Sequence, residues 1–310
     1  MSRWPRASAR PPTARPRGHD QPSRIMVNLV NFYGLNCYYD AVMSAADTLG
    51  VDYTAAFHNL WAETRFRYDP FRKRFVSRFM MDSLDTLGCH LEKLECKGPP
   101  DVERHFSYMD EGDLLVVGMD AYYVPWNPYF GIFFGPHYFV VEYSRGGIMR
   151  AYDPTYGFAD ETIPRGLLVE RSCHVNIMRP RERGTLAIDT TAAIAEAAAA
   201  IPGSLARLME WLDRVEAGGQ KGAGQAARYV ECMVSNRKLF RLYLERREPG
   251  VLAALPVLDD GLFKRWAAIK NGLNKAAVVR RNPRLMGEIR GCLAEVMARE
   301  AEAAKGYRQG

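Results

Sequence analysis

Cys37 is the residue of this sequence with the clearest features of a nucleophile. It follows a Gly-Leu-Asn turn and opens a stretch of helical periodicity that ends at Gly50. A helix N-terminus directs unpaired amides and a positive dipole end at the group beside it, which favours a thiolate over a thiol. The backbone N–H of Cys37 can donate to a developing oxyanion, and Asn31 and Asn28 are candidates for the second donor.

His137 and Asp153 are the candidate partners of this cysteine. His137 opens the run HYFVVEY, Asp153 closes the run IMRAYD, and the turn-forming sequence SRGG separates them. A hairpin centred near Arg145 places the two side chains directly opposite each other, with Cβ atoms about 5 Å apart. The carboxylate then fixes the imidazole tautomer and leaves the other nitrogen for the cysteine. A one-residue slip would turn them to opposite faces. A structural histidine and an Asp-Pro turn are the alternative reading of these residues.

The elements that position these residues divide into two regions. Apolar spacing predicts helices at 37–49 and 57–87. Runs rich in β-branched and aromatic residues predict strands at 90–96, 113–118, 137–143, 148–152 and 173–178. Further helices are predicted at 190–216, 225–247, 259–279 and 283–304, the first two separated by the glycine-rich 218–224. We therefore predict an α+β domain over 26–180 and an all-helical domain over 186–310.

Composition indicates a folded protein with a distinct N-terminal segment. The hydrophobic fraction is 47%, and no apolar run approaches the roughly 20 residues needed to span a bilayer, so we expect no membrane association. Residues 1–25 hold six Arg and five Pro without an apolar h-region, which predicts a disordered basic tail rather than a secretory signal. The six cysteines show no C-x-x-C pair or zinc spacing. We therefore expect reduced thiols, no metal and a cytoplasmic location.

Charge is unevenly distributed along the chain. Residues 25–183 carry sixteen Lys/Arg and twenty-one Asp/Glu, a net charge of −5, whereas residues 184–310 carry twenty and fourteen, a net charge of +6. Basic residues concentrate in the last two predicted helices. The candidates for docking an acidic carrier protein there are Lys264, Arg265, Lys270, Arg280 and Arg281. A solvated helix face is the alternative, and no nucleic-acid-binding motif accompanies these charges.

An aromatic segment precedes the candidate histidine. Its sequence DAYYVPWNPYF (120–130) contains too much proline for a central strand. The candidates for lining a substrate pocket are Tyr122, Tyr123, Trp126 and Tyr129. An ordinary loop that packs its aromatic residues into the core is an equally good interpretation.

The order and spacing of the three candidate residues resemble those of papain-fold cysteine enzymes, including the bacteriocin-leader peptidases. The chain is more closely similar to the butirosin-biosynthesis H family. The matching segments are GLNCYYDAVMSAADTLG (34–50), VVGMDAYYVPWNPYF (116–130) and PHYFVVEYSRGGIMRAYDP (136–154), followed by the helical tail. The resemblance implies a papain-like α+β fold over most of 26–180. Peptidases of this fold commonly carry Gln six residues before the cysteine, where this chain has Asn31.

The resemblance implies an acyltransferase of natural-product or antibiotic biosynthesis, which moves an acyl or aminoacyl group from a carrier-protein thioester to a small-molecule amine. Cys37 would carry the acyl group as a thioester, His137 would act as general base and then acid, and Asp153 would orient it. The implied partner is an acyl carrier protein, with no cofactor beyond the phosphopantetheine on the substrate.

Two other functions are consistent with the same residues. A papain-fold cysteine peptidase or amidase uses the same acyl-cysteine intermediate and differs only in the nucleophile that resolves it. A non-catalytic binding module would leave Cys37 with ordinary thiol reactivity.

Overall fold

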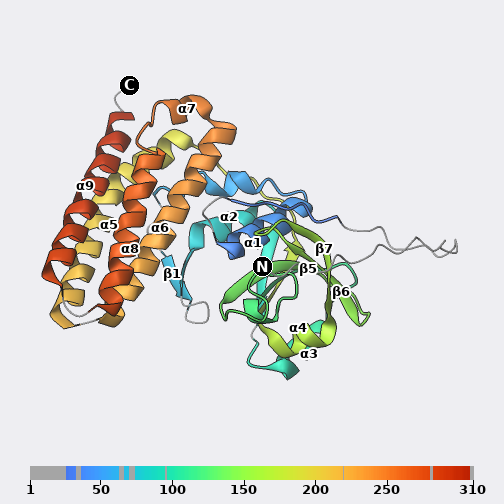
Figure 1. Ribbon diagram of the computed structural model, residues 1–310. Coiled ribbons are helices and arrows are strands. Elements are labelled where there is room, and N and C mark those ends of the chain that lie inside the picture. Colours follow the sequence, from blue (N-terminus) through green and yellow to red (C-terminus); the bar gives the residue numbers. More distant parts are fainter. Residues whose placement is uncertain are drawn as a thin grey trace, which may run out of the picture.

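The computed structural model describes residues 26–32, 36–62, 66–69, 74–94, 96–218, 220–279 and 282–307. A mixed part built on one antiparallel sheet lies beside a bundle of long helices (Figure 1). The predicted order, an α+β region followed by an all-helical region, is confirmed. The predicted tail 1–25 lies outside the described residues.

The central sheet has six strands in the order β3-β8-β4-β5-β6-β7, and every neighbouring pair is antiparallel. The strands are β3 (Cys89–Leu94), β4 (Leu114–Asp120), β5 (Pro136–Glu142), β6 (Ile148–Asp153), β7 (Phe158–Pro164) and β8 (Ser172–Pro180). β4 lies inside the sheet, and its side chains alternate between two cores: Leu114 faces one and Leu115 the other. Burial on both faces explains why this strand is an unbroken apolar run in the sequence.

Helices cover both faces of the sheet. α1 (Cys37–Thr48) packs on β4 and β5 on the side of the larger core. α3 (Pro99–Phe106) and α4 (Arg165–Arg171) pack together over the opposite face, where Val102 and Leu168 are fully buried. The sequence patterns did not predict α3, α4 or β7, which are short elements.

The helical part contains α5 (Thr190–Gly218), α6 (Gln220–Arg247), the short α7 (Pro249–Ala253), α8 (Asp260–Val278) and α9 (Pro283–Tyr307). α5 packs on α9 and α6, and α8 packs on α6 and α9. The glycine-rich sequence predicted to separate the first two helices lies mostly inside α6, which begins at Gln220. Glycine has a low helix propensity, but α6 packs against neighbouring helices, and this tertiary packing stabilises the helix through its glycine-rich start.

α5 is, among the described helices, the one long and apolar enough to cross a membrane by length and composition. Of its most apolar window, 39% is buried inside the protein. It packs along α9 and α6 in the bundle.

The region predicted as one helix at 57–87 is different in the structure. It contains the 3-10 helix η1 (Tyr53–Phe57), a hairpin of β1 (Phe66–Asp69) and β2 (Arg74–Ser77), and only then α2 (Arg78–Thr86). The hairpin packs against α6, where the Phe66 and Tyr229 rings lie 5.0 Å apart. This tertiary packing overrides the local helical spacing of the sequence.

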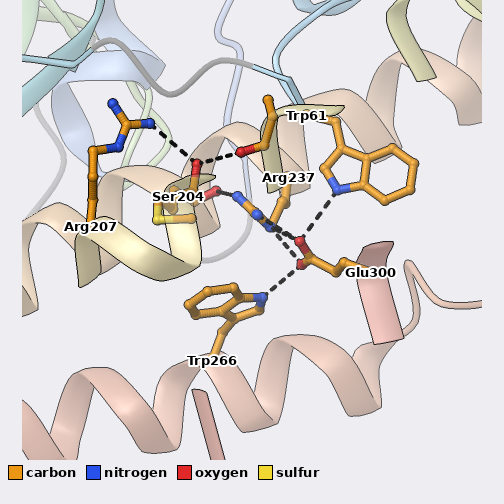
Figure 2. A network of polar contacts seen from close by, with 8 residues as sticks. Trp61, Ser204, Arg207, Arg237, Trp266 and Glu300 are labelled. Atoms are coloured by element: carbon orange, nitrogen blue, oxygen red, sulfur yellow. Dashed lines mark hydrogen bonds and ion pairs between the residues drawn. The ribbon is translucent and has the colours of Figure 1, made fainter. Parts of the chain in front are cut away.

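A buried ion pair inside the helical part also receives a hydrogen bond from the mixed part (Figure 2). Arg237 on α6 and Glu300 on α9 are almost fully buried, and Arg237 Nη2 lies 2.6 Å from Glu300 Oε2. The indole N–H of Trp266 donates to the same carboxylate at 2.9 Å, and that of Trp61, from the mixed part, donates at 3.5 Å. Trp61 also stacks near Phe240, so one hydrophobic core extends through both parts.

Candidate active site

Cys37 is the first residue of α1, as predicted, and it is partly exposed. Asn36 is the N-cap, and its side-chain Oδ1 accepts from the N–H groups of Tyr38 at 3.1 Å and Tyr39 at 3.3 Å. Asp40 N–H is bound to the Asn36 carbonyl. The Cys37 N–H is the first amide of the helix, and an amide at this position can serve as an oxyanion donor.

A stripe of polar side chains on α1 fixes the chain segment that leads to Cys37. Phe32 N–H donates to Asp40 Oδ1 at 3.0 Å and Val30 N–H to Ser44 Oγ at 2.8 Å. Asn28 N–H donates to Thr48 Oγ1 at 3.0 Å. Every fourth residue of the helix advances about 6 Å, and every second residue of an extended segment advances about 6.6 Å. Successive side chains on α1 therefore meet successive N–H groups of the segment.

His137 and Asp153 form a short buried hydrogen bond, with 2.6 Å between His137 Nε2 and Asp153 Oδ2. Asp153 is fully buried and His137 is 4% exposed. Because Nε2 faces the carboxylate, Nδ1 is the ring nitrogen left for Cys37, which is near enough to contribute to the raised pKa of His137. The three predicted residues therefore come together in the order required for a cysteine nucleophile, a base and an orienting carboxylate.

The hairpin register differs from the prediction by two residues. Val140 pairs with Tyr152 and Glu142 with Arg150, which centres the turn on Gly146. Ser144 Oγ accepts from the Gly146 N–H and helps to place the turn there. His137 and Asp153 are thus diagonal neighbours rather than directly opposed, and an even shift leaves them on the same face of the sheet.

The electrostatics of the pair favour the imidazolium form of His137. Burial by itself lowers the pKa of His137, but the hydrogen bonds and charges of Asp153 and Cys37 outweigh it and raise that pKa from 6.5 to about 9. An imidazolium beside a sulfur at a helix N-terminus stabilises a thiolate.

Trp126 supports the carboxylate of the triad. Its indole N–H donates to Asp153 Oδ2 at 3.0 Å, and its ring packs edge-on against Phe139. Among the described groups, Asp153 Oδ1 has no hydrogen-bond donor, so Oδ2 makes both bonds. Trp126, predicted as a pocket residue, hydrogen-bonds the carboxylate of Asp153 and so helps to position it.

Asp40 is a further buried carboxyl beside the triad, one helical turn after Cys37. It is 1% exposed, and its second oxygen accepts from Thr155 Oγ1 at 2.9 Å. Burial raises the pKa of Asp40 from 3.8 to about 6, and the nearby charge of Asp153 adds to this rise. Asp40 thereby joins the segment entering the nucleophile helix to the turn that follows Asp153. Its spacing from Ser44 and Thr48 in the sequence was the signal that could have identified it.

The two asparagines predicted as oxyanion donors make other hydrogen bonds. Asn31 Nδ2 donates to the carbonyls of Pro154 at 2.9 Å and Thr155 at 3.1 Å, which anchors the turn after Asp153. Asn28 Nδ2 donates to Asp47 at the far end of α1, too distant from Cys37 to serve the site. The Cys37 N–H stays a predicted donor.

The remaining aromatic candidates lie around the loop before β5. Tyr122 stacks on Phe134 with ring centroids 4.3 Å apart, and Tyr123 lies under the Arg171 guanidinium. Tyr129 is 49% exposed.

Tyr156 was not predicted, and its ring lies 5.3 Å from that of His137. It follows Asp153 by three residues within the turn that Asn31 anchors, and this position was the available signal.

The predicted basic docking residues are only partly available for a partner. On α8, Arg265 is paired with Glu295, and Lys270 lies 3.4 Å from Glu231. Lys264 is exposed. Arg280 and Arg281 lie outside the described residues.

A cavity connects α6 and α8 with the start of α1. It has a volume of about 160 Å³ and is lined by Asn36, Lys238, Lys270, Ser235, Phe263 and Trp266, among others. Burial and the charge of Lys270 lower the pKa of Lys238. A wider cavity of about 960 Å³ lies between α9 and the loop before α8, and no triad residue lines it.

No family model matches this chain, and no curated protein matches it. Within the described ranges, no three His, Cys, Asp or Glu side chains gather as a metal-ligand set.

Proposed function

We propose that this chain is a papain-like cysteine acyltransferase that moves an acyl group from a carrier-protein thioester to an amine through an acyl-Cys37 intermediate. The observation that carries the proposal is the buried His137–Asp153 hydrogen bond beside a cysteine at a helix N-terminus. Its elements are a nucleophile, a proton carrier and an orienting acid.

The proposed reaction has two halves. The Cys37 thiolate attacks the thioester carbonyl, and the oxyanion that forms is stabilised by the Cys37 N–H. Collapse breaks the carbon–sulfur bond to the carrier, whose departing thiolate takes the proton from His137. An amine then attacks the acyl-cysteine and gives its proton to neutral His137, and collapse releases the amide and restores the Cys37 thiolate beside the imidazolium.

Transfer is favoured over hydrolysis by the sequence resemblance and by the cavity at the start of α1. Lys238 and Lys270 line this cavity, and so does Asn36, the residue that directly precedes the nucleophile. Glu231, which lies 3.4 Å from Lys270, also lines the cavity, so the two lysines leave an excess of positive charge that suits an anionic group on the donor arm, such as a phosphate. The six free cysteines suit a reducing compartment, so we place the reaction in the cytoplasm.

The test is covalent capture by a panel of acyl-pantetheine thioesters, read as intact mass. We expect wild type to gain one acyl group, Cys37→Ala to gain none, and Cys173→Ala, which removes an exposed cysteine elsewhere, to behave as wild type. Loss of the acyl group to added amines with formation of the amide supports transfer.

Other results assign other functions. Loss of the acyl group to water at the same rate with and without amines would identify a hydrolase, that is a peptidase or amidase. Equal alkylation of Cys37 and Cys173 by iodoacetamide at pH 6–7 would identify an inert thiol and a binding module.

A further inference from the structure

Six large apolar side chains are exposed to solvent close to the candidate triad. They are Tyr129, Phe130, Ile132, Phe133, Phe134 and Tyr156, and their exposed fractions lie between 37% and 77%. We call these six residues the aromatic platform. Residues 121–141 contain no Asp, Glu, Lys or Arg, so the loop that carries most of the platform has no charged side chain. A group of exposed apolar side chains of this kind is typical of a binding site.

The platform loop is held by its own backbone. The N–H groups of Ile132 and Phe133 both donate to the Tyr129 carbonyl, and the Gly131 N–H donates to the Tyr122 carbonyl at 3.0 Å. Gly131 has φ +68°, a left-handed conformation that suits glycine at this turn.

Asp120 closes the base of the loop. Its Oδ1 accepts from the Tyr122 N–H at 3.0 Å and from the Gly135 N–H at 3.1 Å. The apolar side chains are thus presented outward by a hydrogen-bonded scaffold, and little ordering is needed when a ligand binds.

Part of the platform lies beside the catalytic residues. The Tyr156 ring lies 5.3 Å from that of His137, and the Tyr129 and Phe133 rings lie 5.9 Å apart. The pKa of Tyr156 is raised mainly by burial and further by the charges of Tyr129, Asp153 and Cys37. A group attached to the Cys37 sulfur, beside His137, therefore has the Tyr156 side of the platform as its neighbour.

We propose that the aromatic platform binds an apolar acyl chain, alkyl or arylalkyl, of the thioester substrate. The inference rests on the proposed acyl transfer and names its substrate class. A membrane surface fits less well, because residues 25–183 carry a net charge of −5, which opposes anionic lipids.

The first test needs only a reactive Cys37. The alkylation rate of Cys37 is measured by intact mass with iodoacetamide and with N-octyl iodoacetamide, and the rate in Cys37→Ala is subtracted. We expect the octyl reagent to react about tenfold faster, because several methylenes are buried in the encounter.

Variants locate the effect. Ile132→Ser combined with Phe133→Ser is expected to remove most of the octyl preference while leaving the iodoacetamide rate unchanged. Val278→Ser, an equally exposed aliphatic residue at the end of α8, should change neither rate. An octyl preference that is absent in wild type, or unchanged in the platform variant, would overturn the inference.

A second test separates this inference from the proposed function. Octanoyl-pantetheine should acylate wild type faster than acetyl-pantetheine, and the platform variant should lose the difference. Equal acylation by both refutes the apolar substrate and leaves the acyltransferase standing. No acylation by any thioester, together with a platform-dependent octyl preference, refutes the transferase and retains the apolar site. Binding to phosphatidylcholine vesicles that the platform variant loses, with no octyl preference, assigns the surface to lipid and overturns the inference.

Discussion

Replacing Asp153 with Asn tests the electrostatics of the candidate triad directly. The change keeps the shape of the side chain and removes the charge that, together with Cys37, raises the pKa of His137 to about 9. In the variant, burial becomes the larger influence on the imidazole, so the pKa of His137 should fall to 6.5 or below. The imidazolium would then be lost at neutral pH, and alkylation of Cys37 by iodoacetamide at pH 6.5 should slow.

The size of the effect follows from the same shift. A pKa of about 9 in place of 6.5 corresponds to about 3 kcal/mol of preference for the imidazolium in the folded state. A histidine whose pKa is raised by folding stabilises the fold fully below pH 6.5, and this contribution is lost as the pH rises through about 9. Wild type should therefore exceed Asp153→Asn in unfolding free energy by about 3 kcal/mol at pH 6, and by far less at pH 10.

Imidazole NMR titration measures the pKa of His137 itself. The chain has six histidines, few enough for His137→Gln to identify the relevant signal. Asp110→Asn removes a side chain that is 83% exposed and serves as the matched control, with no expected change. A His137 pKa that stays near 9 in Asp153→Asn would refute the assignment of Asp153 as the charge that holds the imidazolium.

Three further changes test groups around the site and the helical part. Asp40→Asn removes a carboxyl whose pKa is about 6. Because deprotonating this carboxyl opposes folding, wild type should lose about 2 kcal/mol between pH 4 and pH 7 that the variant keeps, and equal urea-denaturation profiles would contradict this. Trp126→Phe removes one donor to Asp153 and should lower stability by about 2 kcal/mol and slow Cys37 acylation, whereas a change in stability alone would contradict a positioning role. Glu300→Gln leaves Arg237 buried without its counter-charge and should cost about 3–5 kcal/mol in urea unfolding, while Arg237→Met with Glu300→Met should cost less; a larger cost for the double change would refute the ion-pair account.

The sequence predicted those parts of the fold whose patterns are local. Helix α1 begins at Cys37 because Asn36 caps it. The capping residue and the first helical residue are neighbours in the sequence, so the start of the helix can be predicted locally. The four long helices have apolar faces that repeat over many turns, so their positions were predicted within a few residues. His137 and Asp153 were found because a single turn separates their strands.

The features that the sequence did not predict depend on contacts between distant segments. The β1–β2 hairpin is stabilised by packing on α6, more than 140 residues later, as the Phe66–Tyr229 contact shows. The role of Asp40 requires the Thr155 hydroxyl on a strand connection that local periodicity does not place. Trp126 has an aromatic side chain suited to a pocket, and only the fold reveals that its N–H meets Asp153.

The helical part packs on the mixed part and lies next to the residue that caps the nucleophile helix. Trp61, from the mixed part, donates to the buried carboxylate of Glu300, and its ring packs near Phe240 of the bundle. The cavity between α6 and α8 reaches Asn36, the residue that caps the nucleophile helix. A shift of the bundle would therefore change the shape of this cavity. On the proposed function, the basic cavity and the aromatic platform lie on separate elements around Cys37, so a donor's anionic arm and its apolar acyl chain can be bound at the same time without competing for one surface.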